Sequence, residues 1–423
     1  MRQAHEALGI YVSIPFCRSK CTYCNFASGV YPAAEHARYV ERVVADLAAA
    51  GAWSKQHGVE LPRRVDTVYL GGGTPSLLAP ELMARLFAAL RAEFDLEPDA
   101  EITVECAPGQ VADATLEAMA GAGVNRVSLG VQSFVDSEAH ASGRLHSRAV
   151  VAADLPRLRA AGIASLNVDL IAGLAGQTFA SWEESLDALI ATDVPHASVY
   201  MLEVDEDSRL GREMLKGGAR YRAGLVPGED AIARMYERAI ERLAAAGLGQ
   251  YEISNFARPG MESRHNLRYW QRRPYLGVGL DASSALLRAD ALASAAGESL
   301  PRPLLRTTTT SDLRAYLAGT GEMEAQWLMP AEQHEEAWFL GLRTQAGVDV
   351  AAIGREFGAE LLGPAIATVR RLAEDGLLTF KDERVRLTER ARPIANEVFQ
   401  EFLMTGTKEL RREGTRHQAP EGM

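Results

Sequence analysis

The sequence predicts an α/β protein built on a full or partial (β/α) barrel, followed by a small helical domain. Two features of the pattern lead to this prediction. Between residues 9 and 202, six short apolar runs alternate with stretches whose apolar residues recur at helical spacing. From about residue 329 the pattern changes to consecutive helices and then a short β-ribbon. A chain of 423 residues is long enough for two such domains.

Each element of the barrel is expected from its own local pattern. The apolar runs predict strands at residues 9–14, 65–70, 101–105, 126–130, 165–170 and 197–202. The amphipathic stretches predict helices at residues 36–50, 80–94, 113–122, 149–161, 179–191 and 230–246. Residues 250–256 alternate like a further strand. Residues 286–310 are rich in Ala, Ser, Pro and Thr, and we expect them to form a surface insertion or mobile loop.

The C-terminal pattern has the layout of a winged-helix domain. Helices are expected at residues 332–342, 349–357 and 362–376, and residues 377–387 look like two short strands around a charged turn. Winged helices often bind DNA, but no basic recognition face is present here, so a docking or lid role is expected. The predicted organisation is a barrel core at 1–258, a connecting segment at 259–328, a C-terminal domain at 329–405 and a disordered tail at 406–423.

Composition narrows the class of protein further. The chain has 45 Lys and Arg against 56 Asp and Glu, a formal net charge of −11, which argues against a large nucleic-acid surface. No apolar run reaches membrane-spanning length, and the first residues lack the apolar region of a signal peptide. The expected location is therefore the cytoplasm.

Three of the four cysteines, Cys17, Cys21 and Cys24, lie in one short loop with the spacing CxxxCxxC. Three thiolates can ligate three irons of a [4Fe-4S] cluster and leave the fourth iron open to a small molecule. The alternatives are weaker. The spacing suits no single core face, zinc sites usually use paired cysteines, and a chain of this kind is expected to stay reduced. The fourth cysteine, Cys106, offers no second pair and is left out of the cluster.

The run YVSIPFC at residues 11–17, followed by Cys21, Tyr23 and Cys24, closely resembles the radical S-adenosylmethionine (SAM) proteins of the coproporphyrinogen oxidase-like group. The resemblance implies that SAM chelates the open iron and that an electron from the cluster cleaves it to a 5′-deoxyadenosyl radical, which the protein shields. It covers residues 9 to about 402 and implies a radical SAM partial barrel with a HemN-like C-terminal domain. Most relatives have a histidine where Ser13 stands, so any ligand or proton role of that histidine is absent here.

Polar or glycine-rich residues follow several predicted strands, at the edge where (β/α) barrels place their active sites. The resemblance implies that this edge binds SAM through Tyr11, Gly72, Gly73, Thr74, Glu105, Gln132, Arg144 and Asp169. Arg144 could bind the SAM carboxylate, and Glu105, Gln132 and Asp169 could bond to its ammonium and ribose hydroxyl groups. Taken singly, each polar residue could equally belong to a salt-bridged barrel rim.

The segment RHNLRYW at residues 264–270 matches the HNxxYW motif of HemW-type heme chaperones. An exposed His265 would offer an imidazole to an iron, and its aromatic neighbours would offer flat surface to a macrocycle. The resemblance therefore implies that His265 contacts heme. The alternative is a hydrogen-bonded histidine among aromatics that pack on the side of the barrel.

Two functions of different class follow from the resemblance. The first is a heme chaperone that delivers heme to a recipient hemoprotein, expected to be one of respiration and including one held in a membrane, and that draws on an electron donor for its cluster. The second is the oxygen-independent coproporphyrinogen III oxidase. The resembling oxidase has a further cysteine where Phe26 stands and an extension before its cluster loop, and the HNxxYW segment also favours the chaperone. A radical SAM enzyme that modifies RNA is disfavoured by the acidic balance. Oligomeric state stays open, with cluster-dependent dimerisation as one option.

Overall fold

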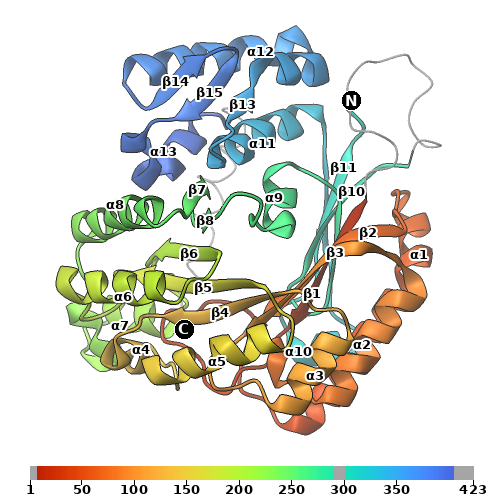
Figure 1. The fold of residues 1–423 in the computed structure, drawn as a ribbon. Coiled ribbons are helices and arrows are strands. Elements are labelled where there is room, and N and C mark those ends of the chain that lie inside the picture. Colours follow the sequence, from red (N-terminus) through yellow and green to blue (C-terminus); the bar gives the residue numbers. More distant parts are fainter. Residues whose placement is uncertain (1–6, 290–300, 404–423) are drawn as a thin grey trace, which may run out of the picture.

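The computed structural model describes residues 7–289 and 301–403. Its centre is a twelve-stranded sheet with the order β12-β11-β10-β9-β1-β2-β3-β4-β5-β6-β8-β7. The six strands β1 to β6 run parallel to one another, as each strand–helix–strand crossover requires. The sheet is curved and open, so it forms a partial barrel, with helices packed on its outer face (Figure 1).

The predicted barrel elements are confirmed, with ends that shift by a few residues. The parallel strands are β1 Leu8–Ile14, β2 Arg64–Gly72, β3 Asp95–Cys106, β4 Arg126–Gln132, β5 Ser165–Ala172 and β6 His196–Met201. The helices between and after them are α1 Ala33–His57, α2 Pro80–Glu93, α3 Asp113–Gly121, α5 Arg148–Ala160, α6 Phe179–Ala191 and α8 Glu229–Ala245. Every residue of β4 is buried, as expected for a central strand covered on both faces.

The flanks of the sheet differ from the prediction. The strand expected at 250–256 is a hairpin of β7 Gly249–Glu252 and β8 Asn255–Ala257. The surface insertion expected at 286–310 is wrong at both ends, because they pair as strands β10 Ser283–Leu287 and β11 Leu304–Thr308. Pairing with β9 Tyr275–Val278 and β12 Glu324–Leu328 buries leucines that local composition had placed on the surface. The middle of that stretch, residues 290–300, lies outside the described residues.

Several short elements have no counterpart in the prediction. They are α4 Asp136–Ala141, α7 Arg209–Leu215, α9 Arg264–Trp270, α10 Leu313–Ala318, and the 3-10 turns η1 Pro75–Leu77 and η2 Arg220–Leu225. One or two helical turns are too short to show a period in the sequence. In the described part of the chain, no helix is both long and apolar enough to cross a membrane.

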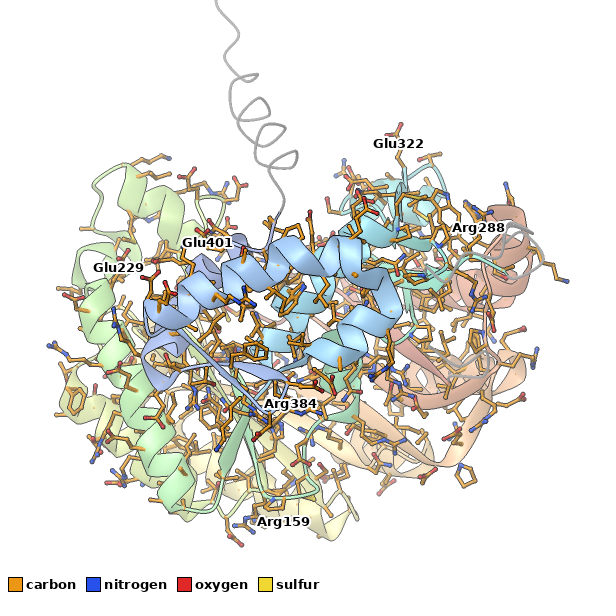
Figure 2. The ribbon with its side chains drawn as sticks, turned by 90° about the horizontal axis from the view of Figure 1, so that it is seen from above. Arg159, Glu229, Arg288, Glu322, Arg384 and Glu401 are labelled. Atoms are coloured by element: carbon orange, nitrogen blue, oxygen red, sulfur yellow. The ribbon has the colours of Figure 1, made fainter. Side chains whose placement is uncertain are left out.

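The C-terminal domain has the predicted winged-helix layout. It consists of α11 Pro330–Arg343, β13 Val348–Asp349, α12 Val350–Glu374, β14 Leu378–Lys381, β15 Arg384–Leu387, η4 Glu389–Ile394 and α13 Ala395–Gln400. Gly358, with a φ of 83°, breaks α12 into the two helices that the pattern predicts. The domain has its own apolar core and lies across the molecule when seen from above (Figure 2). The tail expected at 406–423 lies outside the described residues.

Candidate functional site

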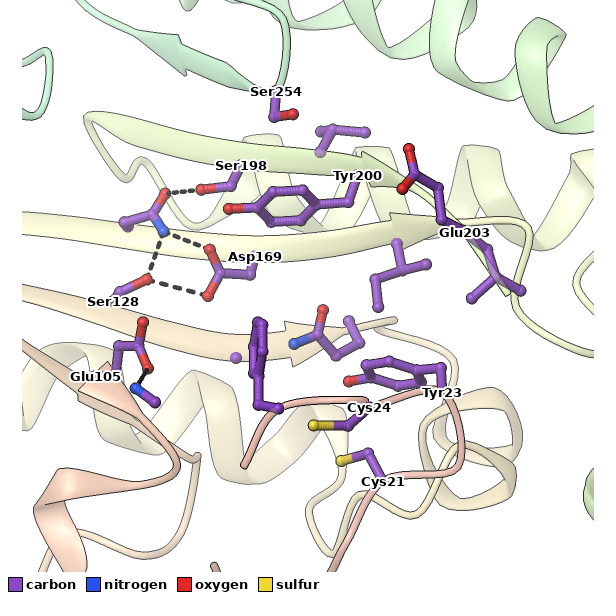
Figure 3. Close-up of a pocket in the computed structure, with 18 of the residues that line it drawn as sticks. Cys21, Tyr23, Cys24, Glu105, Ser128, Asp169, Ser198, Tyr200, Glu203 and Ser254 are labelled. Carbon is purple, nitrogen blue, oxygen red and sulfur yellow. Dashed lines mark hydrogen bonds between the residues drawn. The ribbon is translucent and has the colours of Figure 1, made fainter. Parts of the chain in front are cut away.

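The cysteine loop follows β1 and opens onto a cavity of about 910 Å³. Cys17, Cys21 and Cys24 all line this cavity, are half-buried and form no disulfide. Figure 3 shows two of them, Cys21 and Cys24, at the cavity. The backbone holds the loop in place, because Cys17 N donates to Gly29 O at 2.8 Å and Thr22 N to Ser142 O at 3.0 Å. Three free thiols on one wall of a cavity match the donor set of a [4Fe-4S] cluster with one open iron.

The four cysteines fall into two environments. Among the described residues, no group of three His, Cys, Asp or Glu could hold a single metal ion. A [4Fe-4S] cluster does not need such a group, because each thiolate binds a different iron. The Cys106 thiol is buried and its Sγ lies 3.8 Å from Val104 O. Burial raises the pKa of Cys106 to about 12, so this thiol stays protonated.

The glycine loop after β2 packs directly on the cysteine loop. A Cβ at Gly73 would lie 2.7 Å from Ile14 O and 2.8 Å from Phe16 O, so a larger residue would push the two loops apart. Gly72 has a φ of 95°. Thr74 N donates to Phe16 O at 2.7 Å, and Thr74 Oγ1 lies 3.9 Å from Cys17 Sγ. Gly72, Gly73 and Thr74 all line the cavity.

The two carboxyl groups of the rim are held by different partners. Glu105 accepts two hydrogen bonds, from Tyr69 Oη at 2.9 Å and from Gly72 N at 3.2 Å. Burial raises the pKa of Glu105 to about 7. Asp169 accepts from Ser128 Oγ at 3.0 Å and Asn167 Nδ2 at 2.6 Å, and burial raises its pKa as well (Figure 3).

Gln132 and Arg144 each carry a polar atom without a partner. The buried Gln132 Oε1 and Arg144 Nε make no hydrogen bond in the described structure, although Arg144 Nη2 donates to Tyr23 Oη at 3.1 Å. Gln132 also has a φ of 70°, an uncommon conformation for a residue other than glycine, at a β-bulge in β4. Buried polar atoms are normally satisfied. An unpaired acceptor and an unpaired guanidinium nitrogen therefore fit a zwitterionic ligand such as the methionine end of SAM.

Tyr11 supports this rim from behind and does not line the cavity. Its ring stacks on Tyr69 with centroids 6.0 Å apart. A Cβ at Gly72 would lie 3.4 Å from Tyr11 Oη, so the phenol sits against the glycine loop. The structure thus brings seven of the eight predicted SAM residues to the cavity and places the eighth, Tyr11, against Tyr69 and the glycine loop.

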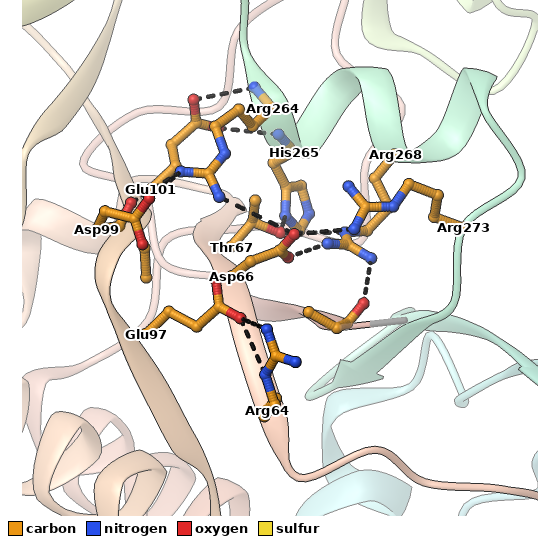
Figure 4. Close-up of polar contacts among 12 residues, drawn as sticks. Arg64, Asp66, Thr67, Glu97, Asp99, Glu101, Arg264, His265, Arg268 and Arg273 are labelled. Atoms are coloured by element: carbon orange, nitrogen blue, oxygen red, sulfur yellow. Dashed lines mark hydrogen bonds and ion pairs between the residues drawn. The ribbon is translucent and has the colours of Figure 1, made fainter. Parts of the chain in front are cut away.

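The expectation that His265 is exposed is wrong, because the HNxxYW segment folds as the helix α9 against the sheet. His265 is 1% exposed, and one ring nitrogen lies 2.9 Å from Thr67 Oγ1 (Figure 4). The other ring nitrogen lies 2.9 Å from Tyr269 Oη. The ring also stacks on Tyr69, 5.2 Å between centroids. Burial and Arg268 lower the pKa of His265 to about 3, so the ring is neutral. Contact with heme stays a prediction, and it requires α9 to be displaced.

Sequence reasoning missed the second half of the cavity. It is lined by alternate residues at the beginnings of β4 to β6 and by residues of the C-terminal domain, namely Arg126, Ser128, Asn167, His196, Ser198, Arg343, Arg392 and Asn396. The alternation along β4 is a signal that the sequence contains, since Arg126, Ser128, Gly130 and Gln132 share one face of the strand.

A partial (β/α) barrel with a CxxxCxxC loop beside a polar rim of this kind defines a radical SAM protein. The chain matches the radical SAM superfamily over residues 11–189 and the HemN C-terminal domain over residues 328–394. Membership of this superfamily implies a [4Fe-4S] cluster and SAM, and the residues described above fit both.

The relatives narrow the class to one family. The chain is 31% identical to the heme chaperone HemW of Lactococcus lactis over 93% of its own length and 97% of the relative. It is 32% identical to the heme chaperone HemW of Bacillus subtilis over 93% and 98%. The chain belongs to the HemW family. The solved coproporphyrinogen III oxidase HemN from Escherichia coli has the same fold, with a TM-score of 0.77, 21% identity and coverage of 95% and 91%.

Proposed function

We propose that this protein is a heme chaperone, which binds heme beside a [4Fe-4S] cluster and SAM and passes it to a recipient hemoprotein. One observation carries the proposal. Relatives named as heme chaperones match the chain over both domains and over nearly their whole length. The similarity therefore includes the barrel, α9 and the C-terminal domain together.

The chain's residues have separate tasks in this proposal. Cys17, Cys21 and Cys24 would hold the cluster, which when bound supplies the single electron for SAM cleavage. Arg144 would neutralise the carboxylate of SAM, and Gln132 and Glu105 would orient its polar groups. The walls of the cavity would keep water from the reactive centre.

The cavity has room for a second ligand. Its volume of about 910 Å³ lies near the top of the range for ligand pockets, about 300–1,000 Å³. Phe26 and Leu145 line its mouth and are 65% and 60% exposed. Exposed apolar side chains at a pocket mouth suit a flat apolar macrocycle. Phe26 also stands where the resembling oxidase carries a further cysteine.

The second candidate is an oxygen-independent coproporphyrinogen III oxidase, favoured by the fold shared with HemN. An anaerobic assay separates the two. Cluster-reconstituted protein is incubated with SAM, a reductant and coproporphyrinogen III, and decarboxylated porphyrinogen and 5′-deoxyadenosine are followed together. We expect no decarboxylated product. Robust product formation would establish the oxidase instead.

Heme delivery itself is tested by transfer. Full-length protein with its cluster is loaded with heme and mixed with an apo-hemoprotein, and the absorbance of the acceptor is followed with and without SAM and reductant. We expect transfer faster than the release of heme to an excess of a passive heme scavenger. Equal rates would mean that heme only dissociates, which would contradict a chaperone.

Location and partners complete the proposal. We place the protein in the cytoplasm, with an electron donor for the cluster and a recipient that can be membrane-bound. We also propose dimerisation that depends on the cluster. Size-exclusion chromatography of the reconstituted and the cluster-free protein tests this, and identical elution of the two forms would exclude it.

A further inference from the structure

The cavity that the cysteine loop opens onto is also lined by arginines from three elements. Arg126 begins β4, Arg343 ends α11 and Arg392 lies in η4. Gln132, at the other end of β4, belongs to the SAM rim, and six residues of a strand span about 20 Å. Arg126 therefore lies well away from the cluster loop, in the same cavity.

Arg126 is a buried cation without a counter-ion. Its side chain is 3% exposed, and its Nη1 donates to Ser165 Oγ at 2.7 Å and to Met261 O at 3.3 Å. Neither partner is charged, and in the described residues no carboxylate pairs with it. Arginine cannot lose its proton in a protein, and burying an unpaired charge is costly. The pKa of the neighbouring His196 is lowered mainly by burial and further by the charge of Arg126. This environment suits a ligand that brings negative charge.

Arg343 and Arg392 bring further positive charge from the C-terminal domain. The guanidinium of Arg343 lies 4.2 Å from the ring centroid of Trp270, and its Nη2 is 3.4 Å from Glu252. Arg392 Nη2 donates to Gln345 Oε1 at 3.0 Å. The Nε atoms of both arginines are buried and lack a partner. Burial raises the pKa of Tyr236, and the guanidinium groups of Arg343 and Arg392 both oppose this rise. Both arginines therefore lie near the Tyr236 phenol.

The three arginines are only partly neutralised by the protein. Glu252 is fully buried and pairs with Arg343, while it also accepts from Ser254 N and Asn255 Nδ2. Arg126 and Arg392 pair with no carboxylate among the described residues. Three guanidinium groups against one carboxylate leave an excess of positive charge, and the planar guanidinium binds carboxylates in a bidentate way.

We infer that Arg126, Arg343 and Arg392 form a carboxylate-binding subsite, which holds the propionate side chains of a tetrapyrrole while its macrocycle reaches toward the cysteine loop. The inference rests on the proposed function, because it assumes that the second ligand of the cavity is heme. It adds an orientation for the ligand and assigns the C-terminal domain a direct part in binding it.

The test compares two probes that differ only in the propionates. Affinities of the full-length, cluster-reconstituted protein are measured for hemin and for hemin dimethyl ester, whose carboxylates are blocked. Three variants each remove one guanidinium group from the cavity: Arg126→Gln, Arg343→Gln and Arg392→Gln. Arg371→Gln is the control, because Arg371 lies in the same domain and pairs with Glu401 on the surface.

We expect the wild type to bind hemin more tightly than the ester by about tenfold or more, the effect of losing a charged hydrogen bond. Each cavity variant should lose most of that preference while its affinities for the ester and for SAM stay unchanged, which also shows that it is folded. Arg371→Gln should keep the preference. Equal binding of both probes by the wild type, or equal weakening of both in the variants, would overturn the subsite and leave heme binding intact. A wild type that binds neither probe would instead contradict the proposed function and the subsite together.

Discussion

At the scale of single residues, Glu105 shows how the rim combines burial with chemistry. Its carboxyl group accepts bonds from Tyr69 and Gly72 that favour the charged form, yet burial outweighs them and raises its pKa to about 7. A carboxyl group with this pKa changes charge near neutral pH. The charge that it offers to a cationic ligand therefore depends on pH, and so does its effect on folding.

Replacing Glu105 by Gln removes this titration. The folded pKa of about 7 lies above the reference value of 4.5, so the folded state binds more protons and the wild type loses stability as pH rises between these values. We expect Glu105→Gln to gain stability relative to the wild type by up to about 3 kcal/mol between about pH 5 and pH 8. Urea unfolding of the SAM-free protein measures it. A difference that does not change with pH would show that the carboxyl group is not perturbed.

The sequence predicted the polar residues that line the cavity beside the cysteine loop better than those that line the rest of it. Glu105, Gln132 and Asp169 were found because the ends of parallel strands meet at one edge, and this rule needs only the position of each strand. Arg343 and Arg392 could not be found in this way, since they reach the cavity through the packing of a domain about 200 residues further along the chain. His265 was misplaced because an aromatic segment looks the same whether it packs or lies exposed.

At the scale of elements, α9 is fixed to the sheet at both ends. At its N-terminus, Glu101 accepts from the backbone N–H groups of Arg264 and His265, each at 2.9 Å. Further along, the fully buried Arg268 pairs with the buried Asp66 (Figure 4). A Cβ at Gly9 would collide with the Arg268 side chain, which explains the glycine at the second position of β1. The HNxxYW segment is therefore a brace beneath Tyr69 and Glu105.

His265→Ala tests whether this brace is structural. The variant removes the His265 partner of Tyr269 Oη and one of the two partners of Thr67 Oγ1, which keeps Arg268 Nε. We expect it to lower the free energy of unfolding by about 2–4 kcal/mol. The wild type should also lose stability as pH falls from about 6.5 toward 3, because its folded pKa is lowered to about 3, and the variant should lose that dependence.

The exposed His140 provides the control, and His140→Ala should change stability by less than about 0.5 kcal/mol. If α9 only braces the sheet, the absorbance spectrum of bound heme should be the same in folded His265→Ala and in the wild type. A changed spectrum would show that His265 reaches the iron.

At the scale of the whole molecule, the C-terminal domain closes the cavity that the barrel leaves open. The β7–β8 turn holds the end of α11, because Ile253 N donates to Arg343 O at 3.1 Å and Gln345 N to Tyr251 O at 2.9 Å. A second contact joins Arg272, after α9, to Glu356 of α12 at 2.7 Å. The sequence predicted both domains, but their interface depends on contacts between distant residues, which local patterns do not contain.

This interface predicts that docking of the domain and heme affinity change together. Arg272→Gln breaks the half-buried pair with Glu356 and removes a guanidinium that lies 5.2 Å from the ring centroid of Phe357. Since Arg343 and Arg392 come from the docked domain, a looser interface should weaken hemin binding several-fold. SAM affinity should not change, because its proposed site lies wholly in the barrel. Arg371→Gln, whose ion pair stays within the C-terminal domain, should alter neither affinity. If Arg272→Gln weakened the binding of SAM and of hemin equally, the substitution would have disturbed the barrel itself. The C-terminal domain would then have no separate part in holding heme.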